Sequence, residues 1–422
     1  MNTASITGHA DTPPSEGRAG AEPSVGPLQG YRVIELGSLV AGPFAGRLLG
    51  DYGADVIKVE APDRPDPLRD WGQQTYRGHG LWWTVHGRNK RCVTMDLRVE
   101  RGQELFKALV RHADVVVENF RPGTLERWSL GWDELSAINP GLILARLSGY
   151  GQTGPYAHRA GYASVAEAMG GLRAINGFPD GPPVRMAVSL GDSLGGMMAV
   201  QGVLAALLHR ERSGRGQIVD IALTEACLAL TESMIPEYDR LGRIRRAGGT
   251  RLDGIAPSNL FKSKDGQWLI VAANQDTVFR RLCTVIGRPE LADDPRFANH
   301  SARGQHQDDI EHIVAEWVKS RSAAEVIRVL EGAGVVVGPV YTAADVVADP
   351  HYRARAALVA HHDERVEEDV LGPGVVPIFS ATPGTVRWAG PPHPGSHNEH
   401  VFCGLLGMTG QTLRSLRHEG VI

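Results

Sequence analysis

From Tyr31 onward, short apolar runs alternate with longer segments in which apolar positions recur every three or four residues. The short runs predict buried strands, and the longer pattern predicts amphipathic helices. Strands are predicted within residues 32–36, 54–60, 90–97, 114–120 and 141–151. Helices are predicted within residues 44–53, 100–113, 124–130, 131–140 and 197–211. This alternation predicts an α/β fold, with a Rossmann-like, doubly wound parallel sheet and right-handed crossovers.

A different pattern begins after a predicted helix at residues 224–241. Residues 242–254 are rich in Gly and Arg and predict a flexible connection. Residues 259–274 predict a β-hairpin with a Lys-Asp-Gly turn, and three further helices are predicted within 275–287, 308–320 and 323–334. We therefore divide the chain into a disordered tail (1–27), a large Rossmann-like domain (28–225), a linker (226–245), a small α+β domain (246–345), and a linker and C-terminal segment returning to the large domain (346–422).

Composition is that of an ordinary globular enzyme, with 42% hydrophobic and 22% charged residues among 422. The net charge of −4 argues against electrostatic binding to nucleic acid or to a membrane surface. Residues 1–27 lack the apolar core of a signal peptide, and no apolar run approaches the roughly 20 residues that span a bilayer. The four cysteines lie far apart without a CxxC pair, which favours a cytoplasmic location and gives no sign of a zinc site.

A lone carboxylate, Asp192, lies between glycines in SLGDSLGGM (189–197), at the start of a long apolar segment. The plainer interpretation is that Asp192 or Ser193 caps a helix. The same place suits a carboxylate nucleophile, because a helix N-terminus favours the ionised form and glycines leave room for an electrophile. The residues alone leave both interpretations open.

Two other patterns point to minor alternatives. Glu60 ends a strand about twenty residues after the loop containing Gly37 and Gly42, as in dinucleotide-binding folds. The full G-x-G-x-x-G is absent, so an NAD-dependent oxidoreductase remains only an alternative. Three histidines have metal-like spacing, but a Pro and a Gly interrupt them, so we predict a solvated loop and no metal; they are His393, His397 and His400. The acidic segment 361–369 predicts a solvated surface.

Six segments together resemble the family III CoA-transferases, which include formyl-CoA transferase and carnitine CoA-transferase. They are residues 33–60, 88–98, 114–132, 142–162, 191–197 and 213–226. The segments follow the family's order, and the resemblance extends from about Leu28 to Ile422. It implies an acyl-CoA:carboxylate CoA-transferase that forms an interlocked homodimer, takes a CoA thioester as substrate and has no permanently bound cofactor.

The resemblance also implies a role for Asp192 as the nucleophile. Asp192 would attack the donor thioester to give an acyl-aspartyl anhydride, and the CoA thiolate would return to give an aspartyl-CoA thioester. The acceptor acid would form a second anhydride, from which CoA thiolate releases the new acyl-CoA. Each step exchanges one activated acyl bond for another, so no ATP is needed, and water has to be excluded.

Further site residues follow from the resemblance, position by position. Those implied in CoA binding are Leu39, Val40 and Ala41 at the pantetheine and thioester end, Arg98 and Arg127 near the nucleotide phosphates, Asn119 and Phe120 along CoA, and Tyr162 near the nucleophile. Formyl-CoA transferase has Gln at the position of Val40, which argues against formyl or oxalyl specificity. The racemase branch has His and Asp where this chain has Tyr162 and Ala163, so a 2-methylacyl-CoA racemase is a minor alternative.

Four segments look most like succinyl-CoA-dependent transferases of dicarboxylic acids such as malate, citramalate or itaconate. They are residues 183–193, 237–242, 250–261 and 272–282. A dicarboxylate needs a cation for its non-reacting carboxylate, and Arg offers a bidentate partner. The sequence gives three such arginines, Arg159, Arg185 and Arg251. A non-catalytic CoA-binding protein is a further alternative.

Overall fold

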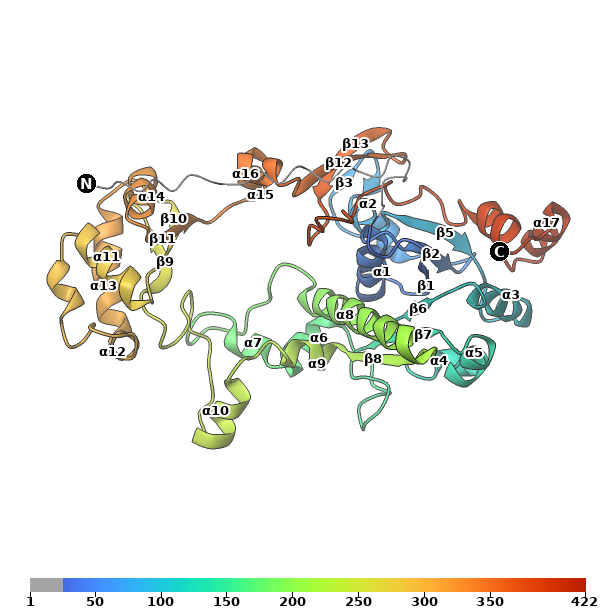
Figure 1. Ribbon diagram of the computed structural model, residues 1–422, viewed down its shortest axis with the longest axis horizontal. Helices are drawn as coiled ribbons and strands as arrows, with labels where there is room; N and C mark the ends of the chain where they lie inside the picture. The colour runs from blue at the N-terminus through green and yellow to red at the C-terminus, as the bar shows by residue number, and fades with distance from the viewer. Residues whose placement is uncertain (1–25) are drawn as a thin grey trace, which may run out of the picture.

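The computed structural model describes residues 26–422 and shows a large α/β body and a smaller α+β body joined by two separate connections (Figure 1). The predicted N-terminal tail lies outside the described residues, except for Gly26 and Pro27. Leu28 begins the large body, where its backbone N–H donates to the carbonyl of Tyr52 at 2.8 Å.

The large body is built on a six-stranded sheet in the order β5-β2-β1-β6-β7-β8. Its strands are β1 (Arg32–Glu35), β2 (Asp55–Glu60), β5 (Lys90–Thr94), β6 (Val115–Glu118), β7 (Ile143–Ser148) and β8 (Ile218–Ala222). Every neighbouring pair is parallel. This is the Rossmann strand order, and it reverses between β1 and β6. The predicted parallel α/β sheet is confirmed.

Alternate residues of the strands enter two separate cores, because side chains of a strand point to opposite faces. Val33 and Val115 pack with α1 (Ala41–Asp51) and α8 (Leu190–Ser213). Ile34 and Val116 pack on the other face. That face is covered by α3 (Glu100–Val110), α5 (Trp132–Ile138), the π-helix η3 (Glu399–Leu405) and α17 (Gly410–His418). The C-terminal segment therefore packs on the large body.

Helix α8 is long and apolar enough, by length and composition, to cross a bilayer. Our expectation that no segment reaches this length is wrong, because the helix begins at Leu190, seven residues before the predicted start. Half of its apolar window is buried, and the helix packs on α1 and on α9 (Leu223–Leu228). The core helix of a soluble protein has the same features, so this one helix is weak evidence for a membrane span.

The small body has its own antiparallel sheet in the order β11-β10-β9 and its own core around Phe261, Phe279 and Phe297. Its strands are β9 (Ser258–Lys262), β10 (Trp268–Ala272) and β11 (Val336–Pro339). Its helices are α11 (Asp276–Val285), α12 (His300–Gln305), α13 (Gln307–Lys319) and α14 (Ala323–Gly332), with the 3-10 helix η2 (Pro289–Ala292). Strands β9 and β10 pair around residues 263–267, which confirms the predicted hairpin.

The two connections carry short helices. The predicted helix at 224–241 is in fact two helices, α9 and α10 (Met234–Leu241), separated by a turn. The return connection carries α15 (Ala343–Ala348) and α16 (Pro350–Ala354), and leads to a hairpin of β12 (Leu358–Asp363) and β13 (Glu368–Pro373). The remaining short elements are η1 (Pro67–Asp70), β3 (Thr75–Tyr76), β4 (His79–Gly80), α2 (Trp82–His86), α4 (Thr124–Arg127), α6 (Ala163–Met169) and α7 (Leu172–Ile175).

Two predicted solvated segments are partly buried. In the acidic segment 361–369, Asp363 is fully buried, and its carboxylate accepts compensating hydrogen bonds from Thr84 and Arg365. In the histidine-rich loop, His397 is half-buried and its Nδ1 accepts from the backbone N–H of Cys92 at 3.2 Å. Within residues 26–422, no group of three His, Cys, Asp or Glu side chains is arranged to hold a metal ion.

Candidate functional site

A cavity of about 270 Å³ lies where the strand order reverses, at the carboxyl ends of β1, β6 and β7. In open parallel sheets this is the place where ligands bind. Most of the lining comes from the carboxyl ends of β1, β6 and β7, from the loops that follow them, and from the first residues of α8 and α9. The lining includes Ser38–Ala41, Asn119–Pro122, Leu147–Gly149, Arg159–Tyr162, Asp192 and Leu223.

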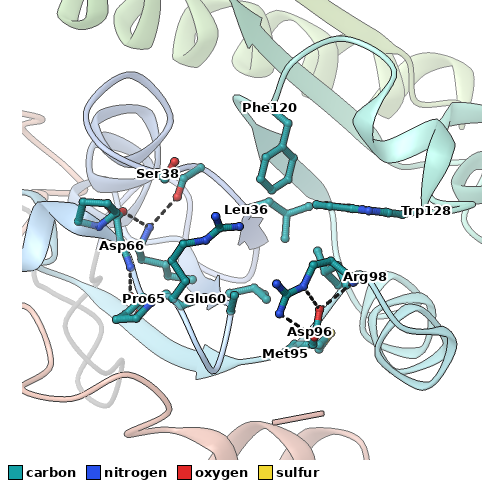
Figure 2. Close-up of a pocket in the computed structure, with 17 residues that line it drawn as sticks. Leu36, Ser38, Glu60, Pro65, Asp66, Met95, Asp96, Arg98, Phe120 and Trp128 are labelled. Carbon is teal, nitrogen blue, oxygen red and sulfur yellow. Dashed lines mark hydrogen bonds and ion pairs between the residues drawn. The ribbon is translucent and has the colours of Figure 1, made fainter. Parts of the chain in front are cut away.

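A second cavity of about 330 Å³ shares Ser38 and Phe120 with the first, so the two are adjacent. Figure 2 shows its labelled side chains, with Phe120 and Trp128 on one side of it and Arg98 beside Asp96 on another. The ring of Phe120 meets that of Trp128 edge to face, with centroids 5.3 Å apart. The two cavities together make a long site with an aromatic residue at their boundary.

Asp192 enters the first cavity from the first turn of α8. The N-cap residue of this helix is Ser189, so the interpretation of Asp192 or Ser193 as the N-cap is wrong. The flanking glycines have a packing reason. A Cβ at Gly191 would lie 3.0 Å from the carbonyl oxygen of Ala163, and one at Gly196 would lie 3.0 Å from that of Ala41. Glycine therefore lets α8 approach both backbones closely, which brings Asp192 next to the loop before α1.

The surroundings of Asp192 raise the pKa of its carboxyl group. Burial first, and then the nearby charge of Glu167, raise the pKa of its carboxyl from 3.8 to about 6, and the charge of Arg185 opposes this rise. At neutral pH the carboxylate is therefore mostly ionised. It is also a stronger base than an ordinary aspartate, and both properties suit a nucleophile.

The loop between β1 and α1 is fixed from two sides. On one side, the Ser38 backbone N–H donates to Asn119 Oδ1 at 2.9 Å, and Asn119 Nδ2 donates to the Ser38 carbonyl at 2.9 Å. On the other side, Asp66 Oδ1 accepts from the backbone N–H of Leu39 at 2.9 Å, and Lys58 Nζ donates to the carbonyl of Gly37 at 2.7 Å. Leu39 has a φ of 63°, an uncommon conformation for a non-glycine residue, which this network maintains.

Lys58 and Asp66 belong to a buried ionic network beneath the loop. Lys58 Nζ lies 2.9 Å from Glu35 Oε1 and 2.8 Å from Asp66 Oδ2, and Lys90 Nζ lies 2.7 Å from Glu35 Oε2. The four side chains are almost completely buried. Removing one partner would leave an uncompensated buried charge and destabilise the network beneath the loop.

Most residues predicted for CoA binding meet at this site. Those that line the cavity of Asp192 are Leu39, Val40, Ala41, Asn119, Phe120 and Tyr162. Arg98 lines the neighbouring cavity, where its guanidinium donates to Asp96 and Asp63. Arg127 is exposed, lines neither cavity, and donates to Thr124 Oγ1 at 2.9 Å. Its predicted contact with CoA stays a prediction.

The three predicted acceptor arginines lie in different places. Arg159 lines the cavity of Asp192 and stacks on Tyr156, with its Cζ 3.7 Å from the ring centroid. Arg185 precedes α8, and its charge reaches Asp192. Arg251 lies in another cavity and pairs with Asp308 and Glu311 of α13. Of the three, only Arg159 lines the cavity of Asp192, and Arg251 lines a different one.

The sequence analysis missed one residue of the site, Glu167, and assigned another, Glu60, a role that the structure contradicts. Glu167, which is 2% exposed, accepts a hydrogen bond from the backbone N–H of Gly191 at 3.3 Å, and no local motif indicated it. Glu60, proposed as a ribose ligand in the NAD alternative, instead holds Arg69 with one oxygen 2.6 Å from Nη2. Its other oxygen accepts from the backbone N–H of Asp66 and from Arg69 Nε. A carboxylate engaged in this way is not the free acceptor that the NAD interpretation requires.

Comparisons with known proteins agree with this geometry. The model of the family described as CoA-transferase family III matches residues 28–398. A succinyl-CoA–D-citramalate CoA-transferase of Chloroflexus aurantiacus is 52% identical over 396 residues, covering 94% of this chain and 98% of the relative. The beta subunit of a succinyl-CoA–L-malate CoA-transferase from the same organism is 42% identical, with coverages of 94% and 98%. A crystal structure of a CAIB/BAIF family protein from Brucella suis matches with a TM-score of 0.77 and 35% identity, covering 90% of this chain and 99% of that one.

Proposed function

Because the chain belongs to the family III CoA-transferases, we propose that it moves CoA from succinyl-CoA to a free dicarboxylic acid of the citramalate or malate type. The observation that carries this proposal is the cavity in which Asp192 meets the loop Ser38–Ala41 at the reversal of the strand order. The named activities of the relatives at 52% and 42% identity support the choice of substrates.

In the proposed reaction Asp192 is the nucleophile. Its carboxylate oxygen attacks the carbonyl carbon of the donor thioester, the C–S bond breaks, and CoA thiolate leaves an acyl-aspartyl anhydride. The thiolate attacks the aspartyl carbonyl of the anhydride, which releases the donor acid as a carboxylate and leaves an aspartyl-CoA thioester. The acceptor carboxylate displaces CoA thiolate to form a second anhydride. Attack of the thiolate on its acceptor carbonyl releases the new acyl-CoA and restores Asp192.

The two adjacent cavities support the proposed binding mode of CoA. The pantetheine and thioester end would occupy the cavity of Asp192, beside Val40 and Tyr162, and the nucleotide end would occupy the neighbouring cavity. Phe120 and Trp128 give that second cavity an aromatic wall, and Arg98 and Arg64 supply positive charge for phosphates. Arg98 would exchange its present carboxylate partners for phosphate oxygens.

We further propose an interlocked homodimer in the cytoplasm. One stripe of α8 exposes large apolar side chains, with Met197 55% and Leu208 57% exposed and Leu204 between them. An apolar stripe on a core helix is typical of a surface covered by another subunit. The two separate connections between the bodies allow one chain to thread through another (Figure 1). Light scattering after gel filtration would give twice the chain mass, and cell fractionation would test whether α8 instead holds the protein in a membrane.

The function is tested by mixing the purified protein with succinyl-CoA and separate free acids, including L-malate, citramalate and itaconate. Mass spectrometry would then show a new acyl-CoA formed by the wild type, and none formed by Asp192→Asn. Absence of product with every acid would contradict the proposed substrates. Product formed by Asp192→Asn would contradict the proposed nucleophile. Exchange of deuterium into C2 of a 2-methylacyl-CoA would instead favour the racemase alternative, although Tyr162 and Ala163 occupy the positions of its acid/base pair.

A further inference from the structure

We propose that Glu167 is a positioning residue for Asp192, which supports the first turn of α8 and favours the acylated, uncharged state of the nucleophile. This inference rests on the proposed function, because it requires Asp192 to be acylated. Glu167 is not itself a nucleophile here, since its side chain is buried and both of its oxygens are engaged.

The contacts of Glu167 join two elements that are distant in sequence. Its Oε1 accepts from the Gly191 backbone N–H at 3.3 Å, and its Oε2 accepts from Arg173 Nη2 at 3.1 Å. The N-cap side chain of Ser189 makes no capping hydrogen bond, so Glu167 satisfies an otherwise free N–H of the helix start. The residue immediately after Gly191 is Asp192, so the bond fixes the backbone that carries the nucleophile.

Several elements bring titratable groups close to Asp192. Helix α6 brings Glu167, the segment before α8 brings Arg185, and the cavity lining brings Arg159 and Tyr162. Helix α9 brings Cys227, whose thiol pKa is raised to about 11, first by burial and then by the charges of Glu167 and Asp192. Glu167 is therefore the carboxylate that acts on Asp192, and Arg173 offsets part of its charge.

Acylation of Asp192 removes the negative charge that lies near Glu167. Before the reaction Asp192 is an anion beside a second, buried anion, and their repulsion raises the free energy of the ionised nucleophile. In the anhydride and in the aspartyl-CoA thioester, the Asp192 side chain is neutral, and the repulsion is absent. The same interaction that makes Asp192 more basic therefore favours the covalent intermediates over the free enzyme.

Two variants with opposite expected effects test this inference. Glu167→Gln keeps the shape and an acceptor for Gly191 but removes the charge. Arg173→Gln removes the cation that offsets Glu167 and leaves its charge in place. We would measure the acidic limb of kcat/KM between about pH 5 and 8, which reports the free enzyme. We would also measure the fraction of protein carrying the CoA adduct, by intact mass after addition of succinyl-CoA alone.

For Glu167→Gln we expect the acidic limb to move down by about one pH unit and the ratio of adduct to free enzyme to fall about tenfold. For Arg173→Gln we expect the limb to move up and the adduct to increase. If the acidic limbs of the two variants stay in place, or move in the same direction, the inference is overturned and Glu167 has only a structural role. If Glu167→Gln does not fold, the direction of the shift in Arg173→Gln decides alone. A wild type without an adduct at Asp192 would refute the proposed function itself, and this inference with it.

Discussion

Asn119 and Ser38 exchange two hydrogen bonds of 2.9 Å across the boundary between β6 and β1, where the strand order reverses. The pair links the segment Glu118–Phe120 to the loop that forms one wall of the Asp192 cavity. Because each bond satisfies a backbone group that is partly buried, its loss frees the loop and leaves polar atoms unpaired. The placement of this wall thus depends on one side-chain amide.

For Asn119→Ala we expect the KM for the acyl-CoA donor to rise about tenfold, equivalent to about 1.4 kcal/mol. The free energy of unfolding should fall by about 1 to 3 kcal/mol, since two hydrogen bonds are lost. Steady-state kinetics and urea unfolding would measure both. Arg127→Gln serves as a control because Arg127 is exposed and lines neither cavity. An equal rise in KM for Arg127→Gln would contradict this assignment of the site.

The raised pKa of Asp192 predicts how activity depends on pH. Only the carboxylate attacks a thioester, and the pKa of this carboxyl is raised to about 6 by burial and by Glu167. We therefore expect kcat/KM to fall about tenfold per pH unit below about pH 6. A profile that stays flat down to about pH 5 would show that Asp192 is more acidic, or that it is not the attacking group.

The same shift predicts a gain in stability for Asp192→Asn. The carboxyl binds its proton more tightly in the folded state, so the folded protein loses stability as pH rises from about 4 to 6. Above about pH 6 the penalty is fully present, and Asn avoids it. We expect Asp192→Asn to raise the free energy of unfolding by about 1 to 2 kcal/mol at pH 7 and to have no effect near pH 3. Urea unfolding of both proteins at about pH 7 and about pH 3 would measure this. The prediction is contradicted if the stability difference between Asp192→Asn and the wild type is the same at both pH values.

The sequence predicted those parts of the fold and site that depend on local pattern. Five of the six strands of the parallel sheet follow from short apolar runs, whereas β8 was not predicted. The charged residues inside these runs, such as Lys58 and Glu35, are the ones that form the buried network. The start of α8 was misplaced because its glycines resemble a loop, whereas they are packing contacts with Ala163 and Ala41. Local pattern cannot show such contacts.

Glu167 could not be found in the sequence for the same reason. It lies in an alanine-rich helix, and its role depends on a hydrogen bond to Gly191, 24 residues later. Arg127 shows a related case: the resemblance implies a role for it, and the structure places its guanidinium on Thr124, outside the linings of both cavities, so its contact with CoA stays a prediction. The roles of the three acceptor arginines likewise depend on tertiary placement, so the sequence could name them but not choose among them.

The positions of Arg159, Arg185 and Arg251 predict different effects of their substitution on binding of the acceptor acid. Arg159 lines the cavity of Asp192, and Arg185 lies within electrostatic reach of it, whereas Arg251 is held by Asp308 and Glu311. We expect Arg159→Gln or Arg185→Gln to raise the KM of the dicarboxylic acceptor at least about tenfold, because a charged hydrogen bond to its second carboxylate is lost. The KM of a monocarboxylic acceptor should stay unchanged. A larger effect in Arg251→Gln would place Arg251 of one subunit at the site of the other.

The close approach of α8 to α1 gives the last prediction. A Cβ at Gly196 would lie 2.8 Å from Phe44 Cδ1 and 3.0 Å from the carbonyl oxygen of Ala41, and the backbone oxygen cannot move without α1. Because Ala41 also lines the Asp192 cavity, we expect Gly196→Ala to cost about 1 to 3 kcal/mol of stability and to lower kcat/KM together with it.

Gly332→Ala is the matched control, because Gly332 ends α14 and nothing lies within 4 Å of its added Cβ. There the same methyl group should leave kcat/KM unchanged and raise stability by up to about 1 kcal/mol, because Ala loses less conformational freedom than Gly on folding. Thermal unfolding and steady-state kinetics of the two variants would separate the cases. If Gly196→Ala behaved like Gly332→Ala, the glycines around Asp192 would not be needed for the contact with α1, and another reason for them would be required.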